Sequence, residues 1–294
     1  MKKVLVIGGK GMLGHKLVQQ LTAAGFDTWA TLHASFNDVE RFGIFDRSKT
    51  VENVDVTDLD AVRRAVESAQ PDVIVNAVGV IKQLPASQDV VHTLLINSIF
   101  PHRLAELAKE VGFRVIHIST DCVFDGSKGN ENEDAVPDAL DLYGQSKHLG
   151  EVTSDDCLTI RTSIIGRELS GAHSLVEWFL SNRGKTVKGF VNAIYTGFPT
   201  VVFADIIASL ITEHVGLTGL YHVSSEPIDK YTLLTLINDK FGTGVTVEPD
   251  EEFSIDRSLD STRFRETTGF VPENWTLMIE RMANDPTDYE KLRQ

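Results

Sequence analysis

Tyr143 and Lys147 are the residues of this sequence whose types and spacing point most directly to chemistry. The segment DLYGQSKHLGE, residues 141–151, places them four positions apart, which puts both side chains on one face of a helix. A tyrosine, with an ordinary pKa of about 10, is a poor acid at neutral pH, but a nearby ammonium stabilises the phenolate and lowers that pKa. Such a pair can give a proton to a carbonyl oxygen. The same spacing arises by chance on solvated helices, so other motifs have to decide.

Two further polar residues extend this candidate site. Thr120, in HISTDCVFDG, comes at the end of an apolar run that predicts a strand, and open α/β sheets bind ligands at the carboxyl edge of their strands. Thr120 would hold the ketone oxygen that Tyr143 protonates. Asn97, on the preceding helix, would order a water that links Lys147 to solvent. The sequence therefore predicts Thr120, Tyr143, Lys147 and Asn97 as the catalytic residues.

A glycine-rich loop lies near the start of the chain, in VLVIGGKGMLGHKLV, between a predicted strand and a predicted helix. Its spacings match both G-x-G-x-x-G and G-x-x-G-x-x-G. Glycine lets the backbone turn tightly and approach a pyrophosphate, while the helix N-terminus faces the phosphates. At the first turn of an alternating chain, the motif predicts dinucleotide binding. The predicted contacts of this loop are Gly8, Lys10, Gly11, Met12, Leu13 and Gly14.

The end of the second strand indicates which dinucleotide is preferred. An acidic residue there favours NAD, but WATLHAS contains none. Lys10, His33 and Arg41 could instead meet a 2′-phosphate, which favours NADP, with NAD as the alternative. Asp55 and Val56, in DVTD after the third strand, could hold the edge of the adenine.

Short β-branched runs alternate with helical patterns through the first half of the chain. The predicted strands are KVLVI, DTWATLH, VENVDV, DVIVNAVG, FRVIHIST and CLTIRTS. The predicted helices are MLGHKLVQQLTAAG, LDAVRRAVESAQ, HTLLINSIFPHRLAELAKEVG and a segment around 143–154, with a break or kink at Pro101. This alternation predicts an α/β fold with a doubly wound parallel sheet of Rossmann type.

After about residue 166 the alternation becomes less regular. SLVEWFLSN, VVFADIIASLITEHV and KYTLLTLINDKFG are helical in pattern, GLYHVS and VTVEP predict strands, and NDPTDYEKLRQ predicts a terminal helix or a frayed tail. We expect a dinucleotide-binding domain over 1–166, to which about 191–223 return. Residues 167–190 and 224–294 would form a smaller α+β C-terminal lobe that binds substrate.

Composition limits the plausible partners. The chain has 294 residues, a net charge of −14 and a pI of about 5.0, so its surface repels nucleic acid and anionic membranes. It has no transmembrane stretch, and the apolar run of residues 4–7 is too short for a signal peptide. Cys122 and Cys157 fit a reducing cytoplasm, and the nine histidines show no metal-ligand spacing. We expect a cytoplasmic protein without a metal.

Taken together, these motifs resemble the extended short-chain dehydrogenase/reductases, and within them dTDP-4-dehydrorhamnose reductase and related nucleotide-sugar 4-ketoreductases. The segments that carry the resemblance are the glycine loop, PDVIVNAVG, VIHISTDCVFDG, YGQSKHLGE, IRTSIIG, TGFPT and GLYHVSS. The resemblance implies that Thr120, Tyr143 and Lys147 form the catalytic triad. It also implies that Asn76, Ala77 and Val78 back the cofactor, together with Tyr143 and Lys147, and that residues 161–163 lie on the nicotinamide side.

The same resemblance indicates a substrate pocket, although two positions depart from the pattern. Cys122 follows STD and Ile164 follows RTS, where these reductases usually have aromatic residues, so the sugar stays open. The predicted substrate contacts are Lys82, Thr120, Asp121, Cys122, Tyr143, Thr162, Ser163 and Arg263, with Gln83 beside them. Candidates for a diphosphate contact are Arg167, Arg183, Lys185, Lys188, Arg257 and Arg263.

The implied activity is NAD(P)H-dependent reduction of the 4-keto group of a nucleotide-linked 6-deoxy sugar, in deoxysugar or polysaccharide biosynthesis, by a monomer or homodimer. One alternative is a reductase of a UDP-linked acetamido-dideoxy-hexosulose. Another is a non-catalytic, NADP-binding regulatory subunit, against which the intact Thr120, Tyr143 and Lys147 argue. An epimerase or dehydratase ranks third, because Asp121 has no glutamate beside it.

Overall fold

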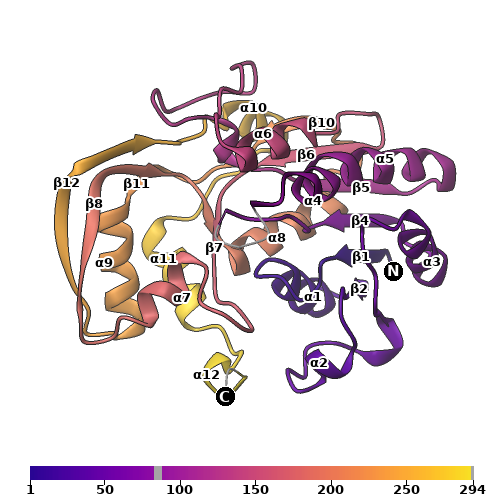
Figure 1. The fold of residues 1–294 in the computed structure, drawn as a ribbon, viewed down its shortest axis with the longest axis horizontal. Helices are drawn as coiled ribbons and strands as arrows, with labels where there is room; N and C mark the ends of the chain where they lie inside the picture. Colours follow the sequence, from indigo (N-terminus) through magenta and orange to yellow (C-terminus); the bar gives the residue numbers. More distant parts are fainter. Residues whose placement is uncertain (83–87, 293–294) are drawn as a thin grey trace.

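A fully parallel sheet forms the centre of the molecule in this computed structural model, which describes residues 1–82 and 88–292. Within these residues the sheet has seven strands in the order β10-β6-β5-β4-β1-β2-β3 (Figure 1). The strands are β1 (Lys3–Ile7), β2 (Asp27–Thr31), β3 (Thr50–Val51), β4 (Val73–Asn76), β5 (Arg114–Ile118), β6 (Cys157–Arg161) and β10 (Gly219–His222). The order reverses between β1 and β4, which confirms the predicted doubly wound Rossmann-type fold.

Helices cover both faces of this sheet because its strands are apolar on both sides. Along β1, Val4 and Val6 face one layer, whereas Leu5 and Ile7 face the other. The first layer contains α1 (Gly14–Ala23) and α8 (Thr200–Thr212), and the second contains α3 (Leu59–Ala69) and α5 (Phe100–Val111). This two-sided burial explains why the strands are near-continuous apolar runs in the sequence.

The predicted interruption near Pro101 is present and takes the form of a π-helical segment. α4 (Val90–Leu94) runs into this segment, Leu95–Ile99, which is followed by α5. Proline has no N–H to donate, so Pro101 leaves the carbonyl of Asn97 without its usual helical partner. The turn that carries Asn97 is therefore displaced from regular helical geometry directly opposite α6 (Leu142–Leu149).

A second sheet lies at the opposite end of the molecule from α3 and α5 (Figure 1). It joins β11 (Ile228–Asp229), β8 (Thr186–Tyr195) and β12 (Thr246–Asp256), with α9 (Lys230–Phe241) packed on β8. β8 pairs in parallel with β12, which is longer than the predicted strand VTVEP. β8 therefore lies outside the central sheet, whereas β10 is one of its strands and α8 packs on one of its faces. The division of the chain into a dinucleotide-binding domain and a substrate-binding lobe stays a prediction.

The other elements are short. They are α2 (Asn37–Glu40), α7 (Leu175–Leu180), α10 (Thr262–Thr268), α11 (Trp275–Ala283), α12 (Tyr289–Leu292), the parallel pair β7 (Ile164–Ile165) and β9 (Phe198–Pro199), and 3-10 turns at Arg47–Lys49 and Asp121–Val123. Among the described helices, none is long and apolar enough to cross a membrane.

The C-terminal segment returns to α1. The Asp285 carboxylate lies 2.5 Å from the Lys16 ammonium, and both side chains are almost fully buried. His15, one position earlier, contacts the Gly11 carbonyl through Nδ1 and the Tyr289 hydroxyl through Nε2, each at 2.9 Å. The end of the chain thus holds the helix that follows the glycine loop.

Asp285→Asn would leave the buried Lys16 ammonium without its charge partner, and we expect it to lower the free energy of unfolding by about 3 kcal/mol. The double variant Lys16→Met/Asp285→Leu removes both charges and should recover most of that loss. Urea unfolding followed by circular dichroism measures both variants. Equal losses in the single and the double variant would contradict the ion pair as the cause.

Candidate active site

The glycine loop is shaped as a cradle for an anion. Gly8 has φ +89° and its N–H donates to the Thr31 hydroxyl, while the N–H of Gly11 closes the turn onto the Gly8 carbonyl at 3.0 Å. A Cβ on Gly14 would lie 2.0 Å from that same carbonyl oxygen, so only glycine lets α1 begin here. In the described part of the chain no side chain caps α1 at Leu13, and the His15 N–H already donates to the Gly11 carbonyl, so a ligand would meet the amides before His15. Met12 lies half-buried in this turn.

The residues expected around the adenosine ribose surround the same loop. Lys10, His33 and Arg41 are exposed, and the Arg41 guanidinium lies over the Phe42 ring at 5.0 Å. Glu52, a residue that the sequence did not single out, directly follows β3, whose Val51 pairs with Thr31 at the end of β2. Its carboxylate accepts from the Phe36 amide at 2.6 Å and from the Ser35 hydroxyl, so it holds the loop after β2.

Asp55 and Val56, the positions predicted for the adenine, follow β3. Asp55 Oδ1 accepts from both the N–H and the hydroxyl of Thr57, and these hydrogen bonds lower the pKa of its carboxyl group. Val56 is buried.

The end of β4 lies against the glycine loop. A Cβ on Gly8 would lie 2.8 Å from Val78 Cγ2, and the Ala77 N–H donates to the Ile7 carbonyl. The buried amide of Asn76 accepts from the Val78 N–H and contacts His117 Nδ1 at 3.1 Å. Asn76, Ala77 and Val78 are therefore placed to form the wall behind a dinucleotide.

The helix that carries the candidate catalytic pair is seated by two glycines. A Cβ on Gly144 would lie 2.2 Å from the Cys122 carbonyl oxygen, and one on Gly150 would lie 1.9 Å from the Asn97 carbonyl oxygen. The Asp141 side chain caps α6 by accepting from the Gly144 N–H. This close approach brings Tyr143 and Lys147, both on α6, to the carboxyl end of β5, where Thr120 lies.

The protonation equilibria of this pair differ from the sequence-based expectation. Burial raises the pKa of Tyr143 above its ordinary value, and only a hydrogen bond with the Thr120 side chain opposes this effect. The expected lowering by Lys147 is therefore wrong for this structure, because desolvation of the phenolate dominates. The Lys147 ammonium donates to the Ile118 carbonyl at 2.7 Å, and burial lowers its pKa to about 8.

Asn97 is buried, and its side-chain amide bonds to protein groups. Its Oδ1 accepts from the Val80 N–H at 2.8 Å, and its Nδ2 donates to the Val80 carbonyl and the Ser146 hydroxyl. The amide thus ties the chain after β4 to α6. The predicted water link from Asn97 to Lys147 stays a prediction.

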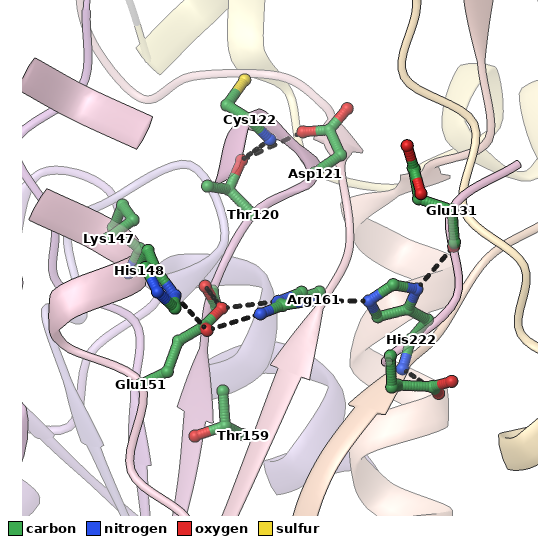
Figure 2. Close-up of polar contacts among 12 residues, drawn as sticks. Thr120, Asp121, Cys122, Glu131, Lys147, His148, Glu151, Thr159, Arg161 and His222 are labelled. Carbon is green, nitrogen blue, oxygen red and sulfur yellow. Dashed lines mark hydrogen bonds and ion pairs between the residues drawn. The ribbon is translucent and has the colours of Figure 1, made fainter. Parts of the chain in front are cut away.

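A buried polar network supports α6 from its C-terminal end (Figure 2). Arg161 donates to both carboxylate oxygens of Glu151 at 2.8 Å, and Glu151 also accepts from Ser119. On its other side Arg161 contacts His222 Nε2 at 3.2 Å, and His222 Nδ1 contacts the Glu131 carbonyl. The Arg161 side chain therefore serves this network, although the resemblance placed it near the nicotinamide.

Thr120, Asp121 and Cys122 form one rim of the site. The Thr120 hydroxyl donates to Asp121 Oδ1 at 3.0 Å and accepts from the Cys122 N–H at 3.1 Å (Figure 2). Burial raises the pKa of Asp121, and together with the Asp121 charge it raises the pKa of the Cys122 thiol to about 12. Cys122 thus carries a thiol rather than a thiolate at this rim.

Of the other predicted substrate contacts, Lys82 lies near Tyr143, whereas Thr162 and Ser163 take part in backbone hydrogen bonds. Lys82 pairs with Asp141 at 2.8 Å and lies 5.7 Å from the centre of the Tyr143 ring. Thr162 is buried behind the rim, and its carbonyl accepts from the Asp121 N–H, while the Ser163 carbonyl accepts from Phe198. Gln83 lies outside the described residues.

Of the six candidate diphosphate contacts, Arg257 reaches the rim. Its guanidinium donates to the Phe124 carbonyl at 3.2 Å and to Cys122 Sγ at 3.7 Å. Three of the others form ion pairs with carboxylates: Arg263 with Asp134 and Glu133, Arg167 with Glu177 and Glu290, and Lys188 with Asp250. Arg183 donates to the Gly242 carbonyl, and Lys185 is exposed. Lys230, which sequence reasoning missed, also acts on Asp121 and Cys122, and no motif marks it.

Within the described residues no group of three or more His, Cys, Asp or Glu side chains is placed to hold a metal ion. The structure thus combines a glycine-loop cradle with Thr120, Tyr143 and Lys147 at one edge of a doubly wound sheet. This combination defines an extended short-chain dehydrogenase/reductase.

The chain belongs to the RmlD substrate binding domain family, whose model matches residues 1–287. It is 30% identical to spore coat polysaccharide biosynthesis protein SpsK of Bacillus subtilis, over 94% of each chain. It is 27% identical to dTDP-4-dehydrorhamnose reductase of Aggregatibacter actinomycetemcomitans, over 96% of this chain and 98% of the relative. The resemblance drawn from the sequence motifs is thereby confirmed.

A third relative has a different kind of name. Methionine adenosyltransferase 2 subunit beta of Danio rerio is 35% identical, over 82% of this chain and 74% of the relative.

Among solved structures, dTDP-4-dehydrorhamnose reductase from Bacillus anthracis in complex with NADP superimposes with a TM-score of 0.77, at 23% identity over 96% of this chain and 98% of that one. The Bordetella bronchiseptica enzyme WbmG in complex with NAD gives 0.76 at 19% identity, over 96% of this chain and 92% of that one. At these identities the likeness shows the fold.

Gly14→Ala would force the start of α1 away from the Gly8 carbonyl. We expect the Kd for NADPH to rise by at least about tenfold, or about 1.4 kcal/mol, because the cradle loses its shape. Gly216→Ala is the matched control, because nothing lies within 4 Å of a Cβ there. Isothermal titration calorimetry measures both variants, and an unchanged Kd for Gly14→Ala would contradict the assigned cradle.

Glu151→Gln would remove a negative charge that raises the pKa of Lys147. Burial already lowers this pKa to about 8, so we expect the neutral variant to lower it further. If the Lys147 ammonium is required, activity falls as pH rises through this pKa, and the alkaline limb of kcat/KM moves to lower pH. His148→Gln is the control: it removes the exposed contact to the Glu151 carboxylate but leaves the charge of Glu151, so the alkaline limb of its kcat/KM profile should not move. An unmoved limb in Glu151→Gln would show that Lys147 does not set it.

Proposed function

We propose that this protein reduces the 4-keto group of a nucleotide-linked 6-deoxy sugar with NADPH as the preferred hydride donor and NADH as the alternative. The observation that carries the proposal is the convergence of Thr120, Tyr143 and Lys147 at the carboxyl end of β5, beside the glycine-loop cradle. The names of relatives such as dTDP-4-dehydrorhamnose reductase support this substrate class. The name of SpsK supports a place in polysaccharide biosynthesis.

In the proposed reaction, Thr120 and Tyr143 hold the ketone oxygen between their hydroxyl groups. The bound cofactor supplies a hydride to C4. The Tyr143 hydroxyl gives its proton to the oxygen as the C4–H bond forms, so the ketone becomes an alcohol and Tyr143 becomes a phenolate. The raised pKa of Tyr143 keeps it protonated before the reaction, and the Lys147 ammonium, one helical turn further along α6, would offset the charge that then develops.

The cofactor preference rests on the loop after β2. Lys10 in the glycine loop and His33 and Arg41 after β2 are exposed, and the Glu52 carboxylate accepts from the Phe36 amide. A 2′-phosphate would meet cations rather than an acid. NADP bound to the Bacillus anthracis reductase is consistent with this choice.

The nucleotide and the sugar substituents stay open between two reductase alternatives. Cys122 is small and half-buried, and Ile164 is partly buried in β7. Both positions leave more room than aromatic side chains would, which favours a bulkier group such as the acetamido substituent of a UDP-linked hexosulose.

A non-catalytic role is the second candidate, because methionine adenosyltransferase 2 subunit beta is a relative at 35% identity. As a regulatory subunit the chain would bind NADP and a larger enzyme without turning over a sugar. The complete set of Thr120, Tyr143 and Lys147, with α6 seated to aim it, favours the reductase.

The setting of the protein is part of the same proposal. Residues 1–166 would hold the dinucleotide and the C-terminal lobe would hold the sugar nucleotide, in a monomer or homodimer. Cys122 and Cys157 are free thiols, which supports a cytoplasmic location.

Tyr143→Phe tests the proposal because it removes only the proton donor. With dTDP- and UDP-linked 4-keto-6-deoxy sugars, we expect wild-type protein to oxidise NADPH with at least one of them. In Tyr143→Phe, kcat should fall by roughly 10²–10⁴-fold while NADPH affinity is retained. Absorbance at the NADPH band measures turnover. NADPH binding without oxidation by any sugar would overturn the reductase and favour the regulatory subunit.

A further inference from the structure

Lys230 is a half-buried cation that acts on Asp121, the residue after the candidate catalytic Thr120. It is the first residue of α9, directly after β11. Its ammonium lies 5.4 Å from the centre of the ring of Tyr195, which is buried at the end of β8. The charged or ionisable groups that act on it are Asp121, Cys122 and Arg257, and burial lowers its pKa.

The acids around Lys230 do not neutralise it by direct contact. Asp229, its neighbour in the chain, directs its carboxylate to the N–H and hydroxyl of Thr232, as the cap of α9. Asp121 uses Oδ1 to accept from Thr120. Within residues 1–82 and 88–292, Lys230 forms no ion pair with a carboxylate, although the chain carries a net charge of −14. An ammonium that has lost part of its hydration and has no close acceptor is destabilised, so a ligand that accepts a hydrogen bond from it would be favoured.

Lys230 and Asp121 together offer complementary hydrogen-bonding groups. An ammonium only donates, and a carboxylate only accepts, at up to about four lone-pair positions. A hydroxyl group matches the pair, because it can accept from Lys230 and donate to Asp121. Asp121 follows Thr120 directly, and Thr120 holds the ketone oxygen in the proposed reaction. The hydroxyl that meets Asp121 should therefore be next to the reacting carbon.

The substrate class has one such hydroxyl. In a 4-keto-6-deoxyhexose the carbonyl carbon has C3 on one side, which bears a hydroxyl, and C5 on the other, which bears a methyl group. We propose that Lys230 and Asp121 bind the C3 hydroxyl and so select sugars that carry it; this inference rests on the proposed function.

A thermodynamic cycle between the lysine and the hydroxyl tests this inference. It compares wild type and Lys230→Met on a nucleotide-linked 4-keto-6-deoxy sugar and on its 3-deoxy analogue. Sites built to bind a hydroxyl reject analogues that lack it, and we expect wild type to prefer the hydroxylated sugar by about 100-fold in kcat/KM. In Lys230→Met, kcat/KM should fall by about 30-fold on the hydroxylated sugar and by less than about twofold on the 3-deoxy sugar.

Two further variants keep the result interpretable. Lys240→Met is the matched control: Lys240 lies near the other end of α9 and its ammonium pairs with Glu280 at 3.0 Å, so both sugars should react as with wild type. Lys230→Gln keeps a polar side chain and serves if the methionine variant fails to fold. For every variant the Kd for NADPH should stay at the wild-type value.

The outcomes separate this inference from the proposed function. Equal losses on both sugars would assign Lys230 to the diphosphate or to packing against Tyr195, and would overturn the inference while the reductase stands. A wild-type enzyme that does not distinguish the two sugars would overturn it as well. Absence of turnover with every sugar would remove the proposed function, and this inference with it.

Discussion

The close approach of α6 to the end of β5 is the constraint on which the candidate site depends. Two glycines permit it: Gly144 lies against the Cys122 carbonyl, and Gly150 lies against the Asn97 carbonyl. No other residue fits at either position without moving backbone. Since Tyr143 and Lys147 are on this helix, their distance from Thr120 is set by backbone packing rather than by side-chain contacts. Rigid placement of this kind is what proton transfer to a bound ketone requires.

The interior electrostatics follow from that packing. The position of α6 buries Lys147. Its ammonium donates to the Ile118 carbonyl, and the nearby Glu151 carboxylate is its counter-charge. Glu151 is itself held by Arg161, and Arg161 is held by His222 on β10, at the edge of the sheet. Although the protein has a strong net negative charge, local groups act on Lys147: burial lowers its pKa and the Glu151 carboxylate raises it.

The sequence was sufficient for the elements that form the central sheet and insufficient for the second one. β1, β4, β5 and β6 are short, mostly apolar runs, a pattern typical of strands that are buried on both faces. β3 is only Thr50–Val51, so the predicted strand VENVDV overlaps it at a single residue. β8 was missed because Gly189 interrupts its alternation; the structure shows that a Cβ there would collide with the backbone of Tyr231 on α9. The second half of β12 is an exposed acidic run, which has low strand propensity on its own.

For the site, sequence reasoning was strong where a motif fixes the backbone and weak where burial decides. It placed Thr120, Tyr143 and Lys147, but it gave the wrong direction for the pKa of Tyr143, because desolvation depends on what covers the side chain. It also missed Lys230, whose position near Asp121 arises only when α9 packs across the rim. These two failures have one origin. The candidate catalytic residues lie just after β5 and on α6, which local patterns specify, whereas Arg257, directly after β12, and Lys230 on α9 reach the rim through the packing of the second sheet. Asp121 directly follows Thr120, whereas Lys230 comes from α9, so the central sheet and the second sheet build the rim together.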